Sequence, residues 1–210
     1  MCNLYKLRRT VEEVAQLFRV EPAAGANVAA ELYPGYSGLV VAEGRVRAMT
    51  WGFPLSLKGR DGRALKPKAV TNARDDKLTT AFWRDSFARR RCLIPVSQWA
   101  EAEGETGRMT RTWYALPGGE QFAVAGLWRP TAEWAGDAYA MVMADSCPAM
   151  AEVHDRMPVI LRPDQWAHWQ DGPPEAALAL ARTWQGELAV ERTRERWAGG
   201  ADIPEQPGLV

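Results

Sequence analysis

The second residue of the chain is a cysteine, and this position could give it a chemistry that no interior cysteine has. A small side chain at position 2 generally permits removal of the initiator methionine, which would leave Cys2 with a free α-amine beside its thiol. An α-amine has a pKa of about 7.7–8.0 and a thiol about 8.5, so both titrate close to neutral pH. Such a 1,2-aminothiol condenses with aldehydes: the amine makes a Schiff base, and the thiolate then closes a thiazolidine ring. Taken alone, position 2 favours the plainer interpretation that Cys2 is a small residue near a chain end.

Two acid–base candidates lie far from Cys2 in the sequence. His154 precedes a predicted buried strand, and an imidazole suits proton transfer near neutral pH. A hydrogen-bonded structural histidine fits that position equally well. Glu101 follows Trp99-Ala100, whose apolar surroundings could desolvate a carboxylate and make it an acid or base. The same pattern also fits a solvated stretch that includes Glu103 and Glu105.

Asn72 and Arg74 lie two residues apart in the segment Thr71-Asn72-Ala73-Arg74. A side-chain amide both donates and accepts, so Asn72 could orient an amine or a thiol. The Arg74 guanidinium could reach a phosphate. As an isolated tripeptide, Asn-Ala-Arg establishes neither role. His168 lies between Trp166 and Trp169 on a predicted helix, and we expect it at the surface or in packing.

Elements predicted from local patterns must position these side chains. Thr10-Val11-Glu12-Glu13 predicts a capping box, and Val11, Val14, Ala15 and Phe18 have the spacing of one buried helix face. Strands are predicted over 38–42 and 45–51, joined at Glu43-Gly44 as a hairpin. The segment 53–68, rich in Gly, Lys and Pro, is predicted to be a flexible surface loop.

The rest of the chain alternates between short strands and helices. Thr79 or Thr80 is predicted to cap a helix that carries Phe82, Trp83 and Phe87 and ends in Arg89-Arg90-Arg91, where structural arginines are favoured over a DNA clamp. Buried strands are predicted over 92–96, 139–144 and 157–161, and a second hairpin over 113–116 and 121–128 across Pro117-Gly118-Gly119. Pro163 and Pro174 are expected to open two late helices, and the tail from Gly199 is expected to be irregular.

This pattern indicates one compact α+β domain over residues 1–210, with its core at about 1–195. We expect a mostly antiparallel, barrel-like sheet with flanking helices, because many short strands are separated by helices without an internal repeat or a dividing linker. The 10 Trp suit both core packing and base stacking.

Charge and cysteine content exclude several classes. The 26 basic and 26 acidic residues balance, so a global basic field for duplex DNA is absent and any nucleic-acid contact must rest on a local groove. The three cysteines, Cys2, Cys92 and Cys147, have no paired spacing, which argues against a disulfide framework and for a reducing compartment. No Cys/His pairing suggests zinc, and no cofactor is expected. The start of the chain lacks an apolar signal region, so we expect a cytoplasmic protein, monomeric and without a membrane segment.

The candidate residues occur in an order that resembles the SOS-response-associated peptidase (SRAP) family of abasic-site processing proteins. The resemblance runs from the start of the chain to about Trp169 and is carried by these segments: Met1-Cys2, Trp51-Gly52, Asn72-Ala73-Arg74, Arg91-Cys92-Leu93-Ile94-Pro95, Glu101 and His154-Asp155-Arg156-Met157-Pro158. It implies a mostly β fold with a basic channel for single-stranded DNA. It also implies that Cys2, once Met1 is removed by the protein itself or by an aminopeptidase, forms a thiazolidine with the abasic-site aldehyde.

The resemblance also implies a role for each remaining candidate. Asn72 would position the amine and thiol, and Glu101 would assist proton transfer in ring opening and Schiff-base formation. His154 would contribute to proton transfer or hold the sugar-phosphate, and Arg74 and Arg156 would contact the DNA backbone at damaged sites of the nucleoid. Crosslink reversal and strand scission by an abasic-site lyase reaction also belong to this class.

The chain departs from the family pattern around these residues. Cys2-Asn3-Leu4 replaces the usual Cys-Gly-Arg, so the basic residue beside the nucleophile is missing, and Lys6 or Arg8 would have to replace it. The family's aromatic pair after Trp-Gly is replaced by Phe53-Pro54-Leu55, and Ala102 stands where a Trp commonly follows the glutamate.

Two alternatives to covalent capture stay open from the sequence. One is a thiol peptidase or amidohydrolase that uses Cys2 as nucleophile and His154 as base. The other is a noncatalytic single-strand binding module that uses only Trp and Arg side chains.

Overall fold

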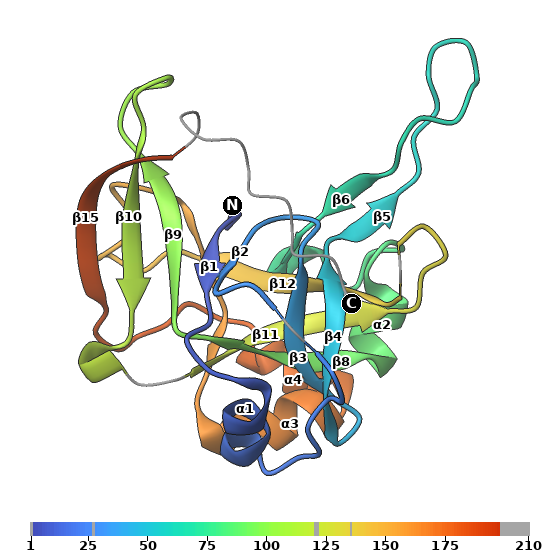
Figure 1. The fold of residues 1–210 in the computed structure, drawn as a ribbon, viewed down its shortest axis with the longest axis horizontal. Helices are drawn as coiled ribbons and strands as arrows, with labels where there is room; N and C mark the ends of the chain where they lie inside the picture. The colour runs from blue at the N-terminus through green and yellow to red at the C-terminus, as the bar shows by residue number, and fades with distance from the viewer. Residues whose placement is uncertain (1, 27, 120–121, 135, 198–210) are drawn as a thin grey trace.

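Two β-sheets form the frame of the molecule. The computed structural model describes residues 2–26, 28–119, 122–134 and 136–197, so the predicted irregular tail from Gly199 lies outside the described residues. Figure 1 shows the smaller sheet beside the larger one, with helices packed below and behind them. The architecture is the predicted α+β domain of mostly antiparallel strands.

In the described residues the smaller sheet has five strands in the order β15-β10-β9-β1-β2. Its members are β1 (Tyr5–Lys6), β2 (Glu31–Leu32), β9 (Gln98–Glu103), β10 (Thr110–Ala115) and β15 (Ala189–Arg196). Strand β1, between β9 and β2, is very short, and it joins the N-terminal segment to β9 with Tyr5 opposite Trp99. This antiparallel pairing leads the chain start back toward Glu101 on β9.

The larger sheet follows the order β13-β12-β4-β3-β8-β11-β14, and a further pairing of β12 with β11 closes it into a ring. Its members are β3 (Ser37–Ala42), β4 (Arg45–Trp51), β7 (Asn72–Arg74), β8 (Arg91–Val96), β11 (Phe122–Arg129), β12 (Ala138–Asp145), β13 (Arg156–Pro158) and β14 (Ile160–Leu161). The β7 strand pairs in parallel with β12. This ring confirms the barrel-like core predicted from the sequence.

The hairpin predicted at Glu43-Gly44 is confirmed. Both turn residues have positive φ, 53° and 73°, as a two-residue turn between twisted strands requires.

The segment 53–68, in contrast, is not a loop along its whole length, which corrects the prediction. Strands β5 (Phe53–Leu55) and β6 (Lys68–Val70) pair antiparallel, and this hairpin projects from the body at the upper right of Figure 1.

The predicted second hairpin across 117–119 is wrong in its pairing. Both strands exist, but β10 pairs with β9 and β15, whereas β11 pairs with β8, β12 and β14 of the other sheet. The Pro-Gly-Gly turn forms the short helix η2 (Pro117–Gly119), which carries the chain from one sheet to the other. The turn residues predict that the chain changes direction, but they do not predict which strands the flanking segments pair with.

The N-terminal helix α1 (Val11–Phe18) has the predicted capping box: Glu13 N–H donates to Thr10 Oγ1, and Thr10 N–H donates to the Glu13 carboxylate at 2.8 Å. Val11, Val14 and Ala15 are buried, as the spacing predicts.

The helix expected to begin at Thr79 or Thr80 is shorter than predicted. Its regular part, α2 (Arg84–Arg89), follows the 3-10 turn η1 (Asp75–Lys77) and a set of turns, and it has no side-chain cap.

Arg91 is not part of α2 but begins β8, where it is buried. Its guanidinium donates to the backbone carbonyls of Phe87, Trp169, Gln170 and Gly172. This confirms a structural role for that arginine. The predicted Pro163 start is a 3-10 turn, η3 (Pro163–Gln165), that leads into α3 (Trp166–Asp171), and Pro174 opens α4 (Pro174–Leu180) as expected.

The two sheets meet at a pair of buried tyrosines. Tyr5 of β1 and Tyr139 of β12 share a hydrogen bond of 2.5 Å between their hydroxyls, and Trp51 of β4 packs edge-on against Tyr5. Gly38 of β3 lies directly below this pair, where a side chain would collide with both hydroxyls. The junction therefore fixes β1, and with it the chain start, against the ring.

Candidate active site

Cys2 lies in the buried interior beside β1. Its side chain is 0% exposed, and Sγ lies 3.6 Å from the carbonyl oxygen of Leu4. Burial raises the pKa of the Cys2 thiol well above its ordinary value, and the charge of the Glu101 carboxylate raises it further. The thiol is therefore neutral at pH 7, and Glu101 lies close enough to act on it.

Asn72 fixes the backbone at Cys2. Its Nδ2 donates to the Cys2 carbonyl at 2.8 Å and to Thr71 Oγ1 at 2.8 Å. Thr71 in turn donates to Asn3 Oδ1 at 3.4 Å. The Asn72 Oδ1 atom is buried and has no hydrogen-bond partner within the described part of the chain. Strand β7 pairs with the buried β12, and the hydrogen bonds of Nδ2 hold the amide beside Cys2 with one buried acceptor left over.

Glu101 is buried in the middle of β9, with 2% of its surface exposed. Burial raises its pKa from 4.5 to about 7, so close to neutral pH the group is present in both protonation states. This carboxyl can therefore donate and accept protons in one reaction cycle. The idea of a solvated glutamate run is wrong for Glu101, because β9 places it inward.

His154 lies in the turn that connects β12 to β13. Burial lowers its pKa, so the ring is neutral at pH 7. Nδ1 accepts the Arg156 backbone N–H at 3.0 Å and also lies 3.1 Å from Asp155 Oδ1. The carboxylate contact is attractive only for a protonated ring, so we assign the backbone N–H as the partner. This assignment leaves the ring proton on Nε2. Asp155 also raises the pKa of Glu101, which places the His154 turn near that carboxyl.

The two arginines predicted to contact DNA are both paired with carboxylates. Arg74 donates two hydrogen bonds of 2.9 Å to Asp76. Arg156 pairs with Asp75 at 3.0 Å and Asp145 at 3.1 Å. The structure thus brings both side chains to the β7 and β13 side of the site, but each already has an anionic partner.

The structure adds three residues that the sequence reasoning did not identify as part of the site. Thr71 carries the hydrogen bond to Asn72, and Thr112 and Tyr114 of β10 lie on the strand next to Glu101. Burial raises the pKa of Tyr114 to about 12. Thr71 could have been suspected as the neighbour of Asn72, whereas the β10 pair depends on strand pairing and has no local signal.

Neither Lys6 nor Arg8 supplies the missing basic residue in this structure. Lys6 pairs with Glu31 at 2.9 Å and lies over the Trp113 ring, on the opposite face of the sheet from Glu101. Arg8 is exposed at the start of the loop before α1, where its backbone N–H donates to Ser97.

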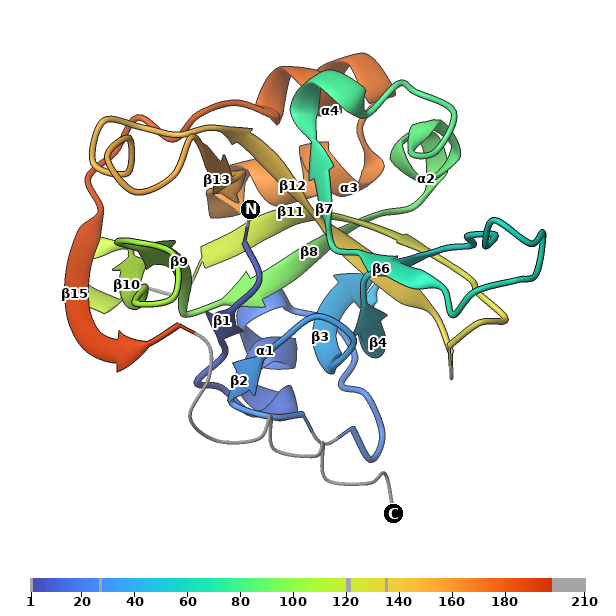
Figure 2. The ribbon, with the colours of Figure 1, turned by 90° about the horizontal axis from the view of Figure 1, so that it is seen from above.

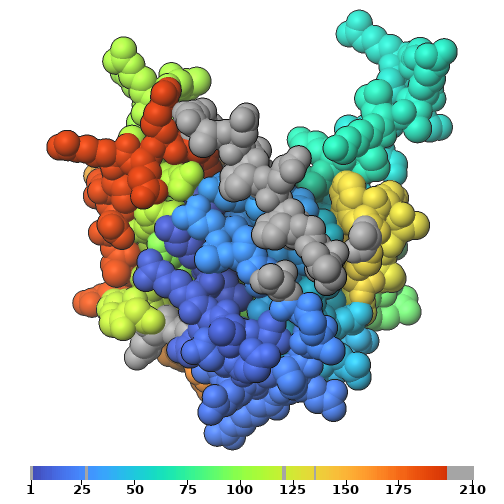
Figure 3. All heavy atoms as spheres, in the orientation of Figure 1, coloured from blue at the N-terminus to red at the C-terminus, as the bar shows by residue number. Residues whose placement is uncertain are grey.

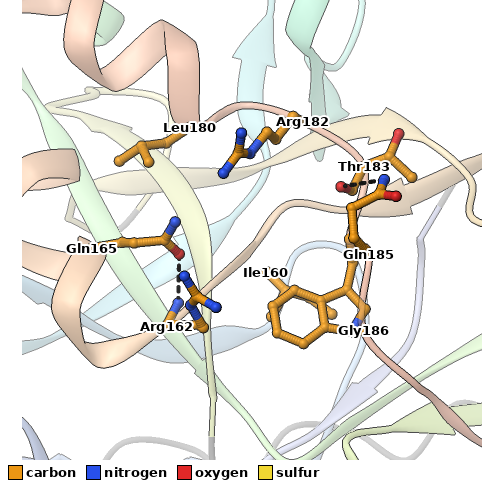
Figure 4. A pocket seen from close by; sticks show the side chains of 9 residues that line it. Ile160, Arg162, Gln165, Leu180, Arg182, Thr183, Gln185 and Gly186 are labelled. Carbon is orange, nitrogen blue, oxygen red and sulfur yellow. Dashed lines mark hydrogen bonds between the residues drawn. The ribbon is translucent and has the colours of Figure 1, made fainter.

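A separate cavity of about 310 Å³ lies between η3 and the segment 182–186 and contains none of these site residues. Arg162, Arg182 and the residues around Trp184 line it, as Figure 4 shows. The candidate active-site residues therefore do not line this cavity. No helix among the described residues is long and apolar enough to span a membrane.

Comparisons with known proteins support the fold and show the family. Solved structures of similar fold include a protein from Bordetella bronchiseptica (TM-score 0.76, 21% identity, 91% of this chain and 99% of that one) and a protein from Bacteroides thetaiotaomicron (TM-score 0.76, 13% identity, 91% of each chain). A phage-related protein from Bordetella bronchiseptica also matches (TM-score 0.68, 17% identity, 92% of this chain and 95% of that one). A search of curated proteins found no match. The model of the family described as SOS response associated peptidase (SRAP) matches residues 1–196, and the chain therefore belongs to this family, which is associated with the SOS response and abasic-site processing.

Proposed function

We propose that this protein captures abasic sites in single-stranded DNA covalently, through a thiazolidine formed by Cys2 after removal of Met1. One arrangement carries the proposal: Asn72 Nδ2 donates to the Cys2 carbonyl at 2.8 Å, and the buried Glu101 is near enough for its charge to raise the pKa of the Cys2 thiol. Cys2 precedes β1, Asn72 begins β7 and Glu101 lies in β9, so three separate segments of the chain supply these residues. A buried glutamate whose pKa is raised to about 7, beside a buried thiol, is typical of functional sites.

The reaction begins when Met1 is lost by hydrolysis, which gives Cys2 a free α-amine. The ring-opened sugar presents an aldehyde, whose carbon the amine attacks to form a carbinolamine. Loss of one water gives the Schiff base. The Cys2 sulfur then adds to the imine carbon while its proton goes to the nitrogen, which closes the five-membered ring. The net change is the union of protein and DNA with release of one water.

Each neighbouring side chain has a step that suits its state. Glu101, with its pKa of about 7, protonates the departing hydroxyl of the carbinolamine and then takes the thiol proton. This second step matters because the raised pKa of Cys2 leaves its thiol uncharged. The free Oδ1 lone pair of Asn72 accepts a hydrogen bond from the new amine. The neutral His154 offers Nε2–H to a sugar or phosphate oxygen.

The DNA contacts of Arg74 and Arg156 require exchange of partners. Both guanidiniums are bound to aspartates, so a phosphate would have to replace Asp76 or Asp145, the more exposed carboxylates. We propose that these contacts position the sugar rather than supply most of the affinity.

A denaturing gel tests the proposal. Purified protein is incubated with single-stranded DNA that contains one abasic site, and the expected result is a heat-stable shifted band. The mass of the adduct should equal that of the protein without Met1 plus the DNA less one water. Intact DNA and the Cys2→Ala variant should give no band, and Cys2→Ser should also fail because a hydroxyl closes the ring poorly. A band that persists in Cys2→Ala would overturn the proposal.

A peptidase activity is the second candidate, because the family is described as a peptidase. Cys2 and His154 would then act as nucleophile and base. The neutral, buried thiol favours a reaction at the protein's own chain start over cleavage of other peptides. Hydrolysis of added peptides in the absence of DNA would support the wider activity.

A further inference from the structure

Strand β15 carries its charges unevenly on its two faces. Arg192, Arg194 and Arg196 alternate with Glu191, Thr193 and Glu195, and alternate residues of a strand point to opposite faces. The contacts agree with this alternation. Arg192 binds Glu103 on one face, at 2.9 Å, whereas Glu195 binds Arg111 on the other, at 3.3 Å.

The arginine face of β15 is the face that carries Glu101. Thr112 of β10 lies opposite Glu101 on one side and opposite Arg192 on the other, so these three side chains form a row across three strands. A register shift follows, and Arg196 then lies opposite Thr110, two residues from Thr112 and on the same face. The other face is closed, because Trp197 packs there against Leu4, Ala100 and Trp113.

The turn that holds His154 borders the same face. Glu152 of this turn lies 3.5 Å from the Arg192 guanidinium, and Figure 2 shows the turn arching beside β15. Arg192 is thus fixed between Glu103 and Glu152 at the edge of the candidate site. It is the first of three arginines that lead away from that site along an edge strand.

Arg194 and Arg196 differ from the arginines predicted from the sequence. Both are exposed, and neither has an ion pair with a carboxylate in the part of the chain that the structure describes. Arg196 makes only a long contact of 3.5 Å to the Gly107 carbonyl. Figure 3 shows the β15 side chains, in red, protruding from the side of the molecule. Arg74 and Arg156, in contrast, are each neutralised by aspartates.

We propose that Arg194 and Arg196, which follow Arg192 along β15, form a phosphate track for the DNA strand on one side of the captured sugar. This inference rests on the proposed function, because it takes the site at Glu101 as the point where the strand is held. Arg192 and Arg196 lie opposite Thr112 and Thr110, which are two residues, or about 6.4–6.8 Å, apart on β10. The arginines therefore present positive charge along the edge of the sheet, where the phosphates of a single strand could follow it. An edge strand often carries charged side chains merely to prevent pairing with another sheet. That explanation predicts that removing the arginines does not change the affinity for DNA.

The test uses binding of single-stranded DNA that contains a tetrahydrofuran abasic analogue, which has no aldehyde and cannot crosslink. The double variant Arg194→Gln/Arg196→Gln is compared with Arg162→Gln/Arg182→Gln, which removes the same charge from the separate cavity of Figure 4. Two oligonucleotides carry their flanking nucleotides on only the 5′ or only the 3′ side of the analogue. The lysine double variant Arg194→Lys/Arg196→Lys, with unchanged thermal unfolding, controls for the fold of β15.

The expected result is a loss of affinity on the order of tenfold at 0.1 M salt for one of the two oligonucleotides only. The slope of log K against log[salt] should fall by about 1.4, since each single-strand phosphate contact contributes about 0.7. The lysine variant should retain most of the binding. An equal loss in the Arg162/Arg182 variant, or no loss on either flank, would overturn the track.

The crosslinking assay keeps the two proposals apart. If the unaltered protein crosslinks to abasic DNA while the β15 variant binds the analogue normally, the track is wrong and covalent capture stands. If the β15 variant loses binding on one flank but the unaltered protein forms no adduct, the track stands and covalent capture is wrong.

Discussion

The raised pKa of the buried Glu101 should make the unfolding free energy of the protein depend on pH. The folded chain raises its pKa from 4.5 to about 7 through burial, whereas the unfolded chain leaves it near the ordinary value. Below pH 4.5 both states are protonated and no penalty arises. Between pH 4.5 and 7 only the unfolded state ionises, so stability is lost as the pH rises, and above pH 7 the loss is complete.

The variant Glu101→Gln should therefore gain stability over the unaltered protein as the pH rises. We expect the difference in unfolding free energy to increase by about 3 kcal/mol between pH 4.5 and pH 8, from the conversion of about 1.36 kcal/mol per pKa unit. Urea unfolding at the two pH values measures it. Glu103→Gln is the matched control on the same strand, because the hydrogen bond from Thr112 lowers the pKa of Glu103 and the sign of its effect should be opposite. A difference for Glu101→Gln that does not change with pH would contradict a raised pKa.

The same residue shows what sequence reasoning can and cannot find. Glu101 could be picked out because Trp99-Ala100 precedes it, but three glutamates in alternate positions also fit a solvated stretch. Only the pairing of β9 with both β1 and β10 places Glu101 inside. Arg74 and Arg156 were found by their residue type, yet the aspartates that neutralise them come from β12 and from the turn after β7.

Elements whose signals are local were predicted well, and elements whose signals are distant were not. The Thr10 capping box and the Glu43-Gly44 turn depend on neighbours within four residues, and both are confirmed. The partners of β10 and β11 depend on strands far along the chain, so the turn between them was misread as a hairpin. Strand β15 was missed because its charged residues look like a solvated segment, while its role in the sheet comes from β10.

The α1 helix offers a test at this scale, since it contains none of the proposed site residues. Thr10→Ala removes the acceptor for the Glu13 N–H and half of the capping box. We expect a loss of about 1 kcal/mol in unfolding free energy, measured by urea unfolding. Adduct formation at a temperature where the protein stays folded should be unchanged. Thr10→Ser, which keeps the hydroxyl, should restore most of the stability, and a slower adduct in Thr10→Ala would show that α1 does influence the site.

At the scale of the whole molecule, the site exists because two sheets hold opposite halves of it. The smaller sheet brings Glu101, and the ring of the larger sheet brings Asn72 and the turn with His154. Cys2 lies where they meet, on the chain that leads into β1. The contacts between the sheets should therefore matter more for the chemistry than for the stability of either sheet.

Gly38 is the position that tests this coupling. A Cβ there would overlap Tyr139 Oη, stand 2.6 Å from Tyr5 Oη and lie 2.8 Å from Leu32 Cδ2, and none of these buried side chains has free space. Gly38→Ala should push β1 away from β3 and β12, which moves Cys2 relative to Asn72. We expect a loss of about 1–3 kcal/mol from overpacking and, in addition, a slower adduct with abasic DNA at a temperature where the protein is folded.

Thr10→Ala is the comparison variant, because it lowers stability without touching the junction between the sheets. Adduct rates of the two variants are compared at temperatures chosen so that each has the same folded fraction by circular dichroism. If the tyrosine junction positions Cys2, Gly38→Ala forms the adduct more slowly than Thr10→Ala at equal folded fraction. Adding Tyr5→Phe to Gly38→Ala removes one of the two hydroxyls that the new Cβ would meet, and it should recover part of the rate. Equal rates for Gly38→Ala and Thr10→Ala would mean that the tyrosine junction does not position Cys2.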